Sequence, residues 1–224
     1  MNQAQSFPRS SIGKKFLMAI TGLMLLGFVL GHMIGNLKAF QGAEKFDAYA
    51  LFLKEVGKPV LGKGDFLWMA RLGLLAAVGI HIFCAVSLTL QNRKARPVGY
   101  KKTAREASTY ASRTMLWGGI ILALYVIYHI LHLTTGHAHH DFGSSVYGNM
   151  VAGFKQWPVS LAYVIAQIAL GMHLFHGFWS AFRTLGANNP NRDKKLRAIA
   201  VFLAVAITAG YLSIPVSVMA GIIQ

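Results

Sequence analysis

Charge is scarce in this chain, and acidic residues are the scarcest of all. The 224 residues include only seven aspartates and glutamates, and 13% of the chain is charged. The hydrophobic share is 54% and the mean hydropathy is +0.47. This composition excludes an ordinary soluble domain and indicates an integral membrane protein.

Cysteine is nearly absent as well. Cys84 is the single cysteine of the sequence, so there is no disulfide framework, no CxxC metal motif and no cysteine set for an iron–sulfur cluster. The sequence also shows no flavin-binding motif. We interpret Cys84, in the middle of an apolar segment, as a small packing residue.

Long apolar runs dominate what is present. Five segments reach the roughly 20 residues that a helix needs to cross a bilayer; they are 14–36, 66–91, 114–135, 158–182 and 198–221. The first is too long for a signal peptide and no clear cleavage site follows it, so we interpret it as a membrane anchor. We predict an all-α integral membrane protein in which residues 1–224 form a single transmembrane domain.

Fifteen of the 22 Lys and Arg residues lie in the N-terminus and in alternate connections between the spans. They are Arg9, Lys14 and Lys15; Arg93, Lys94, Arg96, Lys101, Lys102, Arg105 and Arg113; and Arg183, Arg192, Lys194, Lys195 and Arg197. The positive-inside rule predicts a cytoplasmic N-terminus and an external C-terminus, in a bacterial cytoplasmic membrane. Because membrane lipid and an acidic soluble partner both suit such loops, the net charge of +15 does not call for nucleic acid.

Four successive spans each carry one deep histidine: His32, His81, His129 and His173. At about 1.5 Å per residue, each lies late in its own span. Since successive spans run in opposite directions, His32 and His129 share the outer half of the membrane, and His81 and His173 share the inner half. A buried imidazole is costly unless something binds it. Two imidazoles at one depth are the arrangement that ligates a haem in a bundle.

Small residues accompany three of these histidines, as the edge of a flat porphyrin requires. The stripes are Gly27, Gly31 and Gly35; Gly73, Ala77 and Ala85; and Ala169, Gly177 and Ala181, whereas the third span has only Gly118 and Gly119 at its start. Such stripes also serve direct helix packing, so each alone is weak support.

Three further residues are secondary candidates. His132 and His176 each lie one turn beyond a deep histidine and could replace it as a ligand, although hydrogen bonding near a haem propionate or quinone is the favoured role. Arg71, near the outer edge of the second span, either extends its head group to the membrane surface or neutralises a propionate. The outer segment "GHAHHD" is interpreted as solvated surface.

The chain resembles the single-subunit, five-helix, dihaem cytochrome b membrane anchor of succinate dehydrogenase and fumarate reductase, the b558 type. The resemblance covers nearly the whole chain. It rests on "SSIGKKFLMAITGLML", "GHMIGNL", "EKFDAYA", "HIFCAVSLTLQNRKARPVGY", "SRTMLWGGIILALYVIYHILHL" and "MHLFHGFWSAFRTLG".

The resemblance implies two haem b groups, with His32 and His129 on the iron of the outer haem and His81 and His173 on that of the inner one. It also implies a flavoprotein and an iron–sulfur subunit docked at the cytoplasmic face, which perform the succinate–fumarate chemistry. This chain would be the non-dehydrogenating subunit, passing electrons to or from a quinone, usually menaquinone. We name two outer acids, Glu55 and Asp65, as candidate proton carriers at the quinone site.

Two other functions are open to such a sequence. One is the membrane cytochrome b subunit of a hydrogenase, formate dehydrogenase or nitrate reductase, whose anchors do not place one ligand on each of four consecutive helices. The other is a haem-free transporter or structural membrane protein. A transporter needs intramembrane acids or interrupted helices, and the five predicted spans contain no Asp or Glu.

Overall fold

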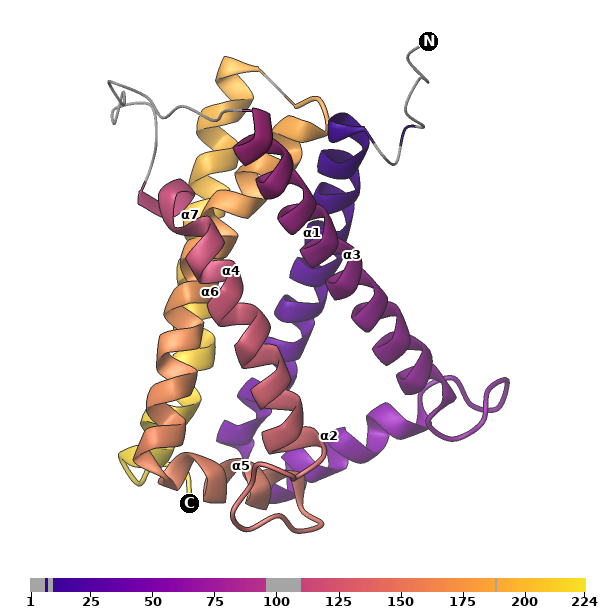
Figure 1. Ribbon diagram of the computed structural model, residues 1–224. Helices are drawn as coiled ribbons and strands as arrows, with labels where there is room; N and C mark the ends of the chain where they lie inside the picture. Colours follow the sequence, from indigo (N-terminus) through magenta and orange to yellow (C-terminus); the bar gives the residue numbers. More distant parts are fainter. Residues whose placement is uncertain (1–6, 8–9, 96–109, 188) are drawn as a thin grey trace.

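The computed structural model describes residues 7, 10–95, 110–187 and 189–224, and within them it is all-helical, without strands (Figure 1). The elements in chain order are α1 (Ser11–Asn36), the 3₁₀ turn η2 (Leu37–Gln41), α2 (Ala43–Glu55), α3 (Asp65–Ala95), α4 (Tyr110–His129), the π-helical turn η4 (Ile130–Thr134), α5 (Val146–Lys155), α6 (Trp157–Thr184) and α7 (Pro190–Met219). Two of the predicted basic stretches, Arg9 and the residues within 96–109, lie outside the described part.

Five of the helical segments are long and apolar enough to cross a membrane, which confirms the five predicted spans. They are Ser11–Gln41, Asp65–Ala95, Thr114–Thr134, Trp157–Thr184 and Pro190–Met219. The last begins at Pro190 rather than at 198, because Asn189 caps the helix with its side chain and proline suits the first turn. The chain therefore has the architecture of a multi-pass membrane protein.

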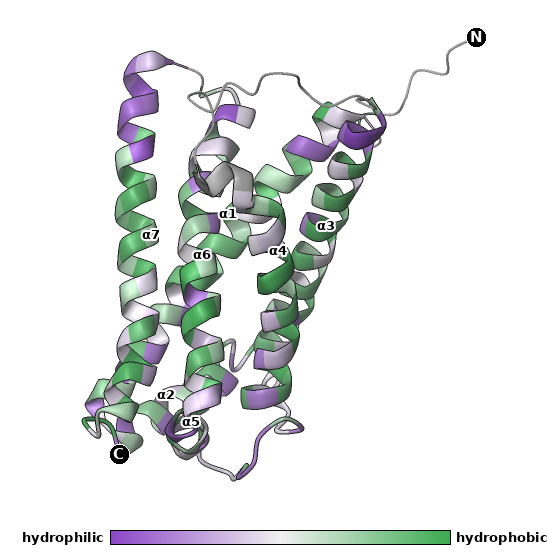
Figure 2. Ribbon diagram, turned by 60° about the vertical axis from the view of Figure 1, so that its left-hand side comes forward, coloured by the Kyte–Doolittle hydropathy of each residue, from purple (hydrophilic) through white to green (hydrophobic). Residues whose placement is uncertain are grey.

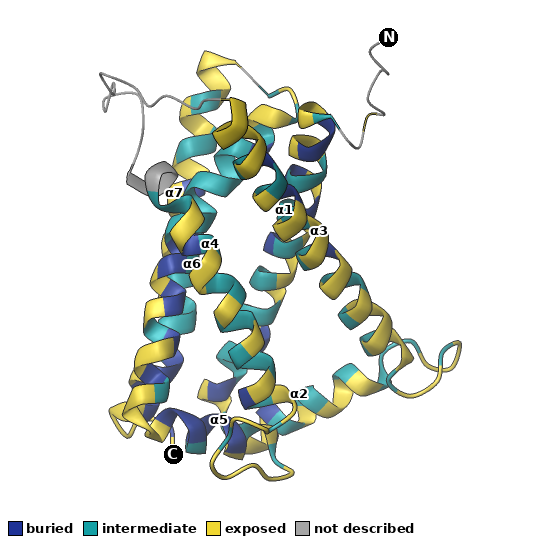
Figure 3. Cartoon of the chain, in the orientation of Figure 1, coloured by how far each residue is buried: buried dark blue, intermediate teal, exposed yellow. Residues whose placement is uncertain are grey.

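The surface of the long helices is apolar, as a lipid-facing surface must be. Figure 2 shows the spanning helices hydrophobic along most of their length, with hydrophilic residues gathered toward the ends. Large apolar side chains point outward, among them Phe83 (65% exposed), Leu124 (63%) and Phe202 (70%), and Figure 3 shows exposed residues down the outside of each helix. An apolar surface of this extent fits a hydrocarbon solvent.

Each long helix packs along at least one other, and α1, α6 and α7 all contact one another. α3 packs along α1, α1 along α6, and α6 along both α4 and α7. At the α6–α7 contact a Cβ added to Gly171 would lie 2.4 Å from the Thr208 hydroxyl, so glycine permits this close approach. In the described residues α1 does not pack closely along α4, nor α3 along α6.

Two shorter helices, α2 and α5, lie across one end of the long helices, at the end where the C-terminus also lies (Figure 1). The Asp47 carboxylate on α2 joins them: it accepts hydrogen bonds from the Ser145 hydroxyl (2.7 Å) and the Tyr147 amide (2.9 Å) at the start of α5. Both segments lie in connections between the five predicted spans, for which the apolar runs predict no helix. Each is an amphipathic helix, and Phe46 and Phe154 bury their rings in the core where these helices meet α6 and α7.

Candidate functional site

The four deep histidines meet as two facing pairs. The ring centroids of His32 on α1 and His129 on α4 are 5.9 Å apart. Those of His81 on α3 and His173 on α6 are 6.2 Å apart. These are the two pairs that counting along alternating spans had predicted.

Each pair joins two helices that do not otherwise pack together. We name the pairs by their predicted depths: the outer pair, His32 and His129, links α1 with α4, and the inner pair, His81 and His173, links α3 with α6. Neither combination of helices packs closely in the described residues. Helices in direct contact bury their side chains against one another. Here the imidazoles instead approach one another across a wider separation, which is the arrangement expected around an inserted cofactor.

The ring separations fit two imidazoles bound to opposite sides of one metal ion. A metal–nitrogen bond of about 2.0 Å plus about 1.1 Å from nitrogen to ring centre places two such centroids about 6 Å apart. The observed values of 5.9 and 6.2 Å agree with this separation. Aromatic rings packed directly against each other span the same range, and ligation by the two pairs stays a prediction.

Glycines beside the histidines leave space on the same helices. A Cβ built on any of five of them would meet no atom within 4 Å: Gly27, Gly31, Gly118, Gly119 and Gly177. Gly35 differs, since a Cβ there would lie 2.7 Å from the ring of Tyr49. Small residues on these helices therefore divide into positions that serve close helix packing and positions with open space beside them.

The inner histidine His81 has a defined tautomer. Its Nδ1 lies 3.1 Å from the Met18 carbonyl and 3.2 Å from the Thr21 hydroxyl. Thr21 donates its own proton to the Leu17 carbonyl (2.7 Å), so both oxygens beside His81 act as acceptors and Nδ1 carries the proton. The lone pair is then on Nε2, free to bind a metal.

His173, rather than His176, faces His81. Its Nδ1 is buried and has no hydrogen-bond partner among the described residues, which is costly for an imidazole unless another group satisfies it. His176 lies against Trp179, with ring centroids 6.0 Å apart. His173 is thus the α6 histidine that lies beside His81, and its role as a ligand stays a prediction.

In the outer pair, His129 rather than His132 faces His32. The His32 ring also stacks on Phe28, with centroids 5.2 Å apart. α4 ends at His129, and the π-helical turn η4 carries His132 away from the pair. His132 is 1% exposed and hydrogen-bonds through Nδ1 to the hydroxyl of Tyr163 at 3.0 Å; this same hydroxyl lies 3.2 Å from Nδ1 of His129.

The polar candidates Arg71, Asp65 and Glu55 do not lie beside the histidine pairs. The Arg71 guanidinium lies over the ring of Trp68, 5.0 Å from its centroid, while the Asp65 carboxylate accepts the amide of Gly62 in its own turn. Glu55 pairs with Lys58 and Lys63, and these two hydrogen-bonded lysines lower the pKa of its carboxyl. All lie near the α2–α3 corner, apart from α4 and α6 (Figure 1).

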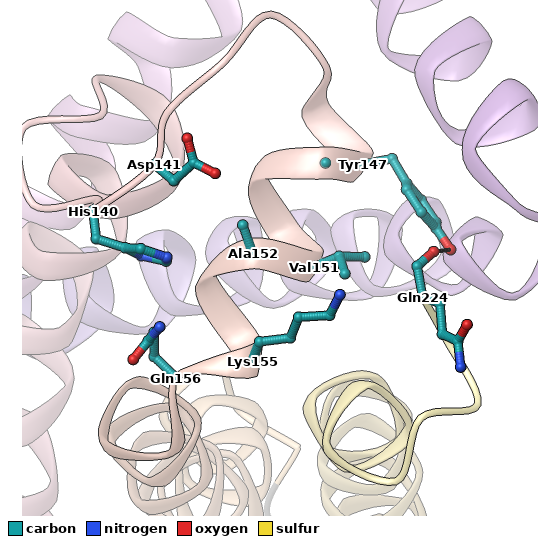
Figure 4. Close-up of a pocket in the computed structure, with 9 residues that line it drawn as sticks. His140, Asp141, Tyr147, Val151, Ala152, Lys155, Gln156 and Gln224 are labelled. Carbon is teal, nitrogen blue, oxygen red and sulfur yellow. Dashed lines mark hydrogen bonds between the residues drawn. The ribbon is translucent and has the colours of Figure 1, made fainter.

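The outer "GHAHHD" segment does not form a metal site within the described residues, where no group of three or more suitable side chains comes together. His140 and Asp141 line an open pocket of about 400 Å³, together with Tyr147, Lys155 and Gln156 (Figure 4). These side chains are mainly exposed, in keeping with the predicted solvated surface. His139 is the exception, because it is half-buried and its ring stacks on His132.

Sequence reasoning missed the two hydroxyl residues that hold the histidines, Thr21 and Tyr163. Both are polar side chains inside apolar spans, and each is buried. Tyr163 lies ten residues before His173, and Gln167, another buried polar residue, lies between them. A search for polar residues recurring along the histidine-bearing face could have found them.

Comparison with protein-family models, with curated proteins and with solved structures finds no match to this chain.

Proposed function

We propose that this chain is the dihaem cytochrome b membrane anchor of a succinate:quinone oxidoreductase, either a succinate dehydrogenase or a fumarate reductase. The observation that carries the proposal is the pair of facing imidazoles at each of two depths, each pair contributed by helices that do not pack together. The resemblance of the spans and their histidine motifs to that family supports the same assignment.

His32 and His129 would hold the outer haem, and His81 and His173 the inner one. Haem, when bound between two histidines, supplies one-electron transfer. The chain's own residues orient the ligands: Met18 and Thr21 fix the tautomer of His81, and neighbouring glycines leave room beside the rings.

The partners would dock at the end where α1 begins. Described cations gather where α1, α3, α6 and α7 have their ends on that side: Lys15, Arg93, Lys94, Arg183, Arg192, Lys194, Lys195 and Arg197. We place this end in the cytoplasm by the positive-inside rule. An iron–sulfur subunit and a flavoprotein with an acidic face would fit it, and the chain would carry electrons between them and a quinone, of which menaquinone is the family's usual form.

A substitution series tests this function. Replacing His32 or His129 with alanine should remove one haem from the reduced-minus-oxidised spectrum of the purified protein, and replacing His81 or His173 should remove the other. His176→Ala is the matched control, since it deletes an imidazole one turn from a proposed ligand and should keep both haems. Equal haem loss in the control and the four ligand variants would reject the assignment.

A further inference from the structure

The hydroxyl of Tyr163 lies between two imidazoles. Its oxygen is 3.2 Å from Nδ1 of His129 and 3.0 Å from Nδ1 of His132. Tyr163 is only 4% exposed, so bulk water does not compete for these bonds. A phenol has a single proton, so it can donate to only one of the two imidazoles.

The direction of the two hydrogen bonds follows from the proposed ligation. A neutral imidazole that binds a metal through Nε2 keeps its proton on Nδ1. His129 must then donate to the oxygen of Tyr163. The Tyr163 hydroxyl is thereby left to donate its own proton to Nδ1 of His132.

We infer that Tyr163 is the positioning residue of the outer site: it holds His129 in the ligating tautomer and strengthens that imidazole as an electron donor. This inference rests on the proposed function. His132 strengthens the hydrogen bond between Tyr163 and His129. A hydroxyl that donates to His132 becomes a better acceptor for His129 through cooperative polarisation.

The position of His132 is set in turn by α5 and the outer loop. Its ring stacks on that of His139, with centroids 4.7 Å apart. His139 accepts the amide of Asp141 at Nδ1 (3.0 Å) and donates from Nε2 to the Asn149 carbonyl (2.8 Å). Gly153 on α5 makes room for both rings, since a Cβ there would lie 2.6 Å from Cε1 of His132. The helix α5 and the loop before it are thus connected to the outer pair through His132 and Tyr163.

The inner pair lacks this dependence on a single side chain. His81 donates to a backbone carbonyl, that of Met18, which no substitution removes. A change at Tyr163 should therefore act on the outer haem alone, and the inner haem serves as an internal measure of correct folding.

Tyr163→Phe is the direct test, made on the haem-loaded protein. Without the acceptor on Nδ1, His129 becomes a weaker donor to ferric iron, so the midpoint potential of the outer haem should rise. Affinity for that haem should fall by about 10- to 100-fold, the usual effect of losing such a partner. The potential and occupancy of the inner haem should not change, as followed by potentiometric titration and haem quantification.

Tyr128→Phe is the matched control. Its ring stacks on His132 with centroids 5.4 Å apart, but its hydroxyl has no hydrogen bond to either histidine in the described residues, so both haems should keep their potentials. His132→Leu, which removes the acceptor of the Tyr163 proton, should raise the outer potential by less than Tyr163→Phe does.

The outcomes separate the inference from the function on which it rests. Wild-type protein with two haems and a Tyr163→Phe variant with an unchanged outer haem would overturn the role of Tyr163 alone. Equal shifts in the Tyr163 and Tyr128 variants would also overturn it, since the effect would not be specific to the hydrogen bond. Wild-type protein without haem would overturn the proposed function itself.

Discussion

At the scale of single residues, what matters is where each imidazole nitrogen finds a partner. His81 and His129 each have Nδ1 hydrogen-bonded, to Met18 and to Tyr163. His173 has a buried Nδ1 with no partner among the described residues. An unsatisfied buried polar group costs about 1–3 kcal/mol, so Nδ1 of His173 carries a free-energy cost that none of the described residues offsets.

Gly22 offers a prediction at this scale. A Cβ there would lie 3.2 Å from Cε1 of His81, so Gly22→Ala requires a small displacement of the ring and Gly22→Leu a large one. We expect inner haem content to fall slightly in the first variant and by most of its value in the second. The measurement is haem quantification with the outer haem as the internal standard.

The comparison of the two Gly22 variants serves as the control for the loss of inner haem. Steric displacement predicts that the loss increases from alanine to leucine while the outer haem persists. Full inner haem content in Gly22→Leu would show that the His81 ring position does not decide binding.

At the scale of elements, the outer layer of α2 and α5 depends on one carboxylate. Asp47 accepts the Ser145 hydroxyl and the Tyr147 amide, and Ser145 in turn caps α5 by accepting the Gly148 amide at 2.9 Å. Hydrogen bonds to a charged acceptor contribute about 1.5–3 kcal/mol each when buried. Because Asp47 is only half-buried, the lower part of that range applies.

Asp47→Ala should therefore release α5 from α2. We expect faster hydrogen exchange in Val146–Lys155, by about 10-fold for each 1.4 kcal/mol lost, while the inner haem spectrum stays unchanged. Glu44→Gln, a change at an exposed position on the same helix, is the control and should leave exchange unaltered. Unchanged exchange in Asp47→Ala would mean that apolar packing alone holds the layer.

The elements also show how far sequence reasoning reached. The five spans and the pairing of histidines by depth follow from apolar run length and helix rise. The helices α2 and α5 were not predicted, because they are only 13 and 10 residues long. Their apolar residues also fall among charged and glycine-rich stretches. The role of Tyr163 was not predicted for another reason. The depth of a residue can be counted along a helix, but the direction of its side chain depends on how the helices pack.

At the scale of the whole molecule, the start of α1 and the end of α7 lie at opposite ends of the long helices (Figure 1). We propose, from the basic residues and the positive-inside rule, that the end where α1 begins faces the cytoplasm. A reporter active only outside the cytoplasm should therefore work when fused after Gln224 and fail when fused before Met1. The reverse pattern would invert the membrane orientation and move the proposed partner surface to the outer face.

The central claim is that the two facing histidine pairs each hold one haem. The most direct test is pyridine haemochrome quantification of the purified wild-type protein after haem-replete expression. The account predicts two b-type haems per chain. A single haem would show that one pair is not a ligand pair, and protein without haem would contradict the account as a whole.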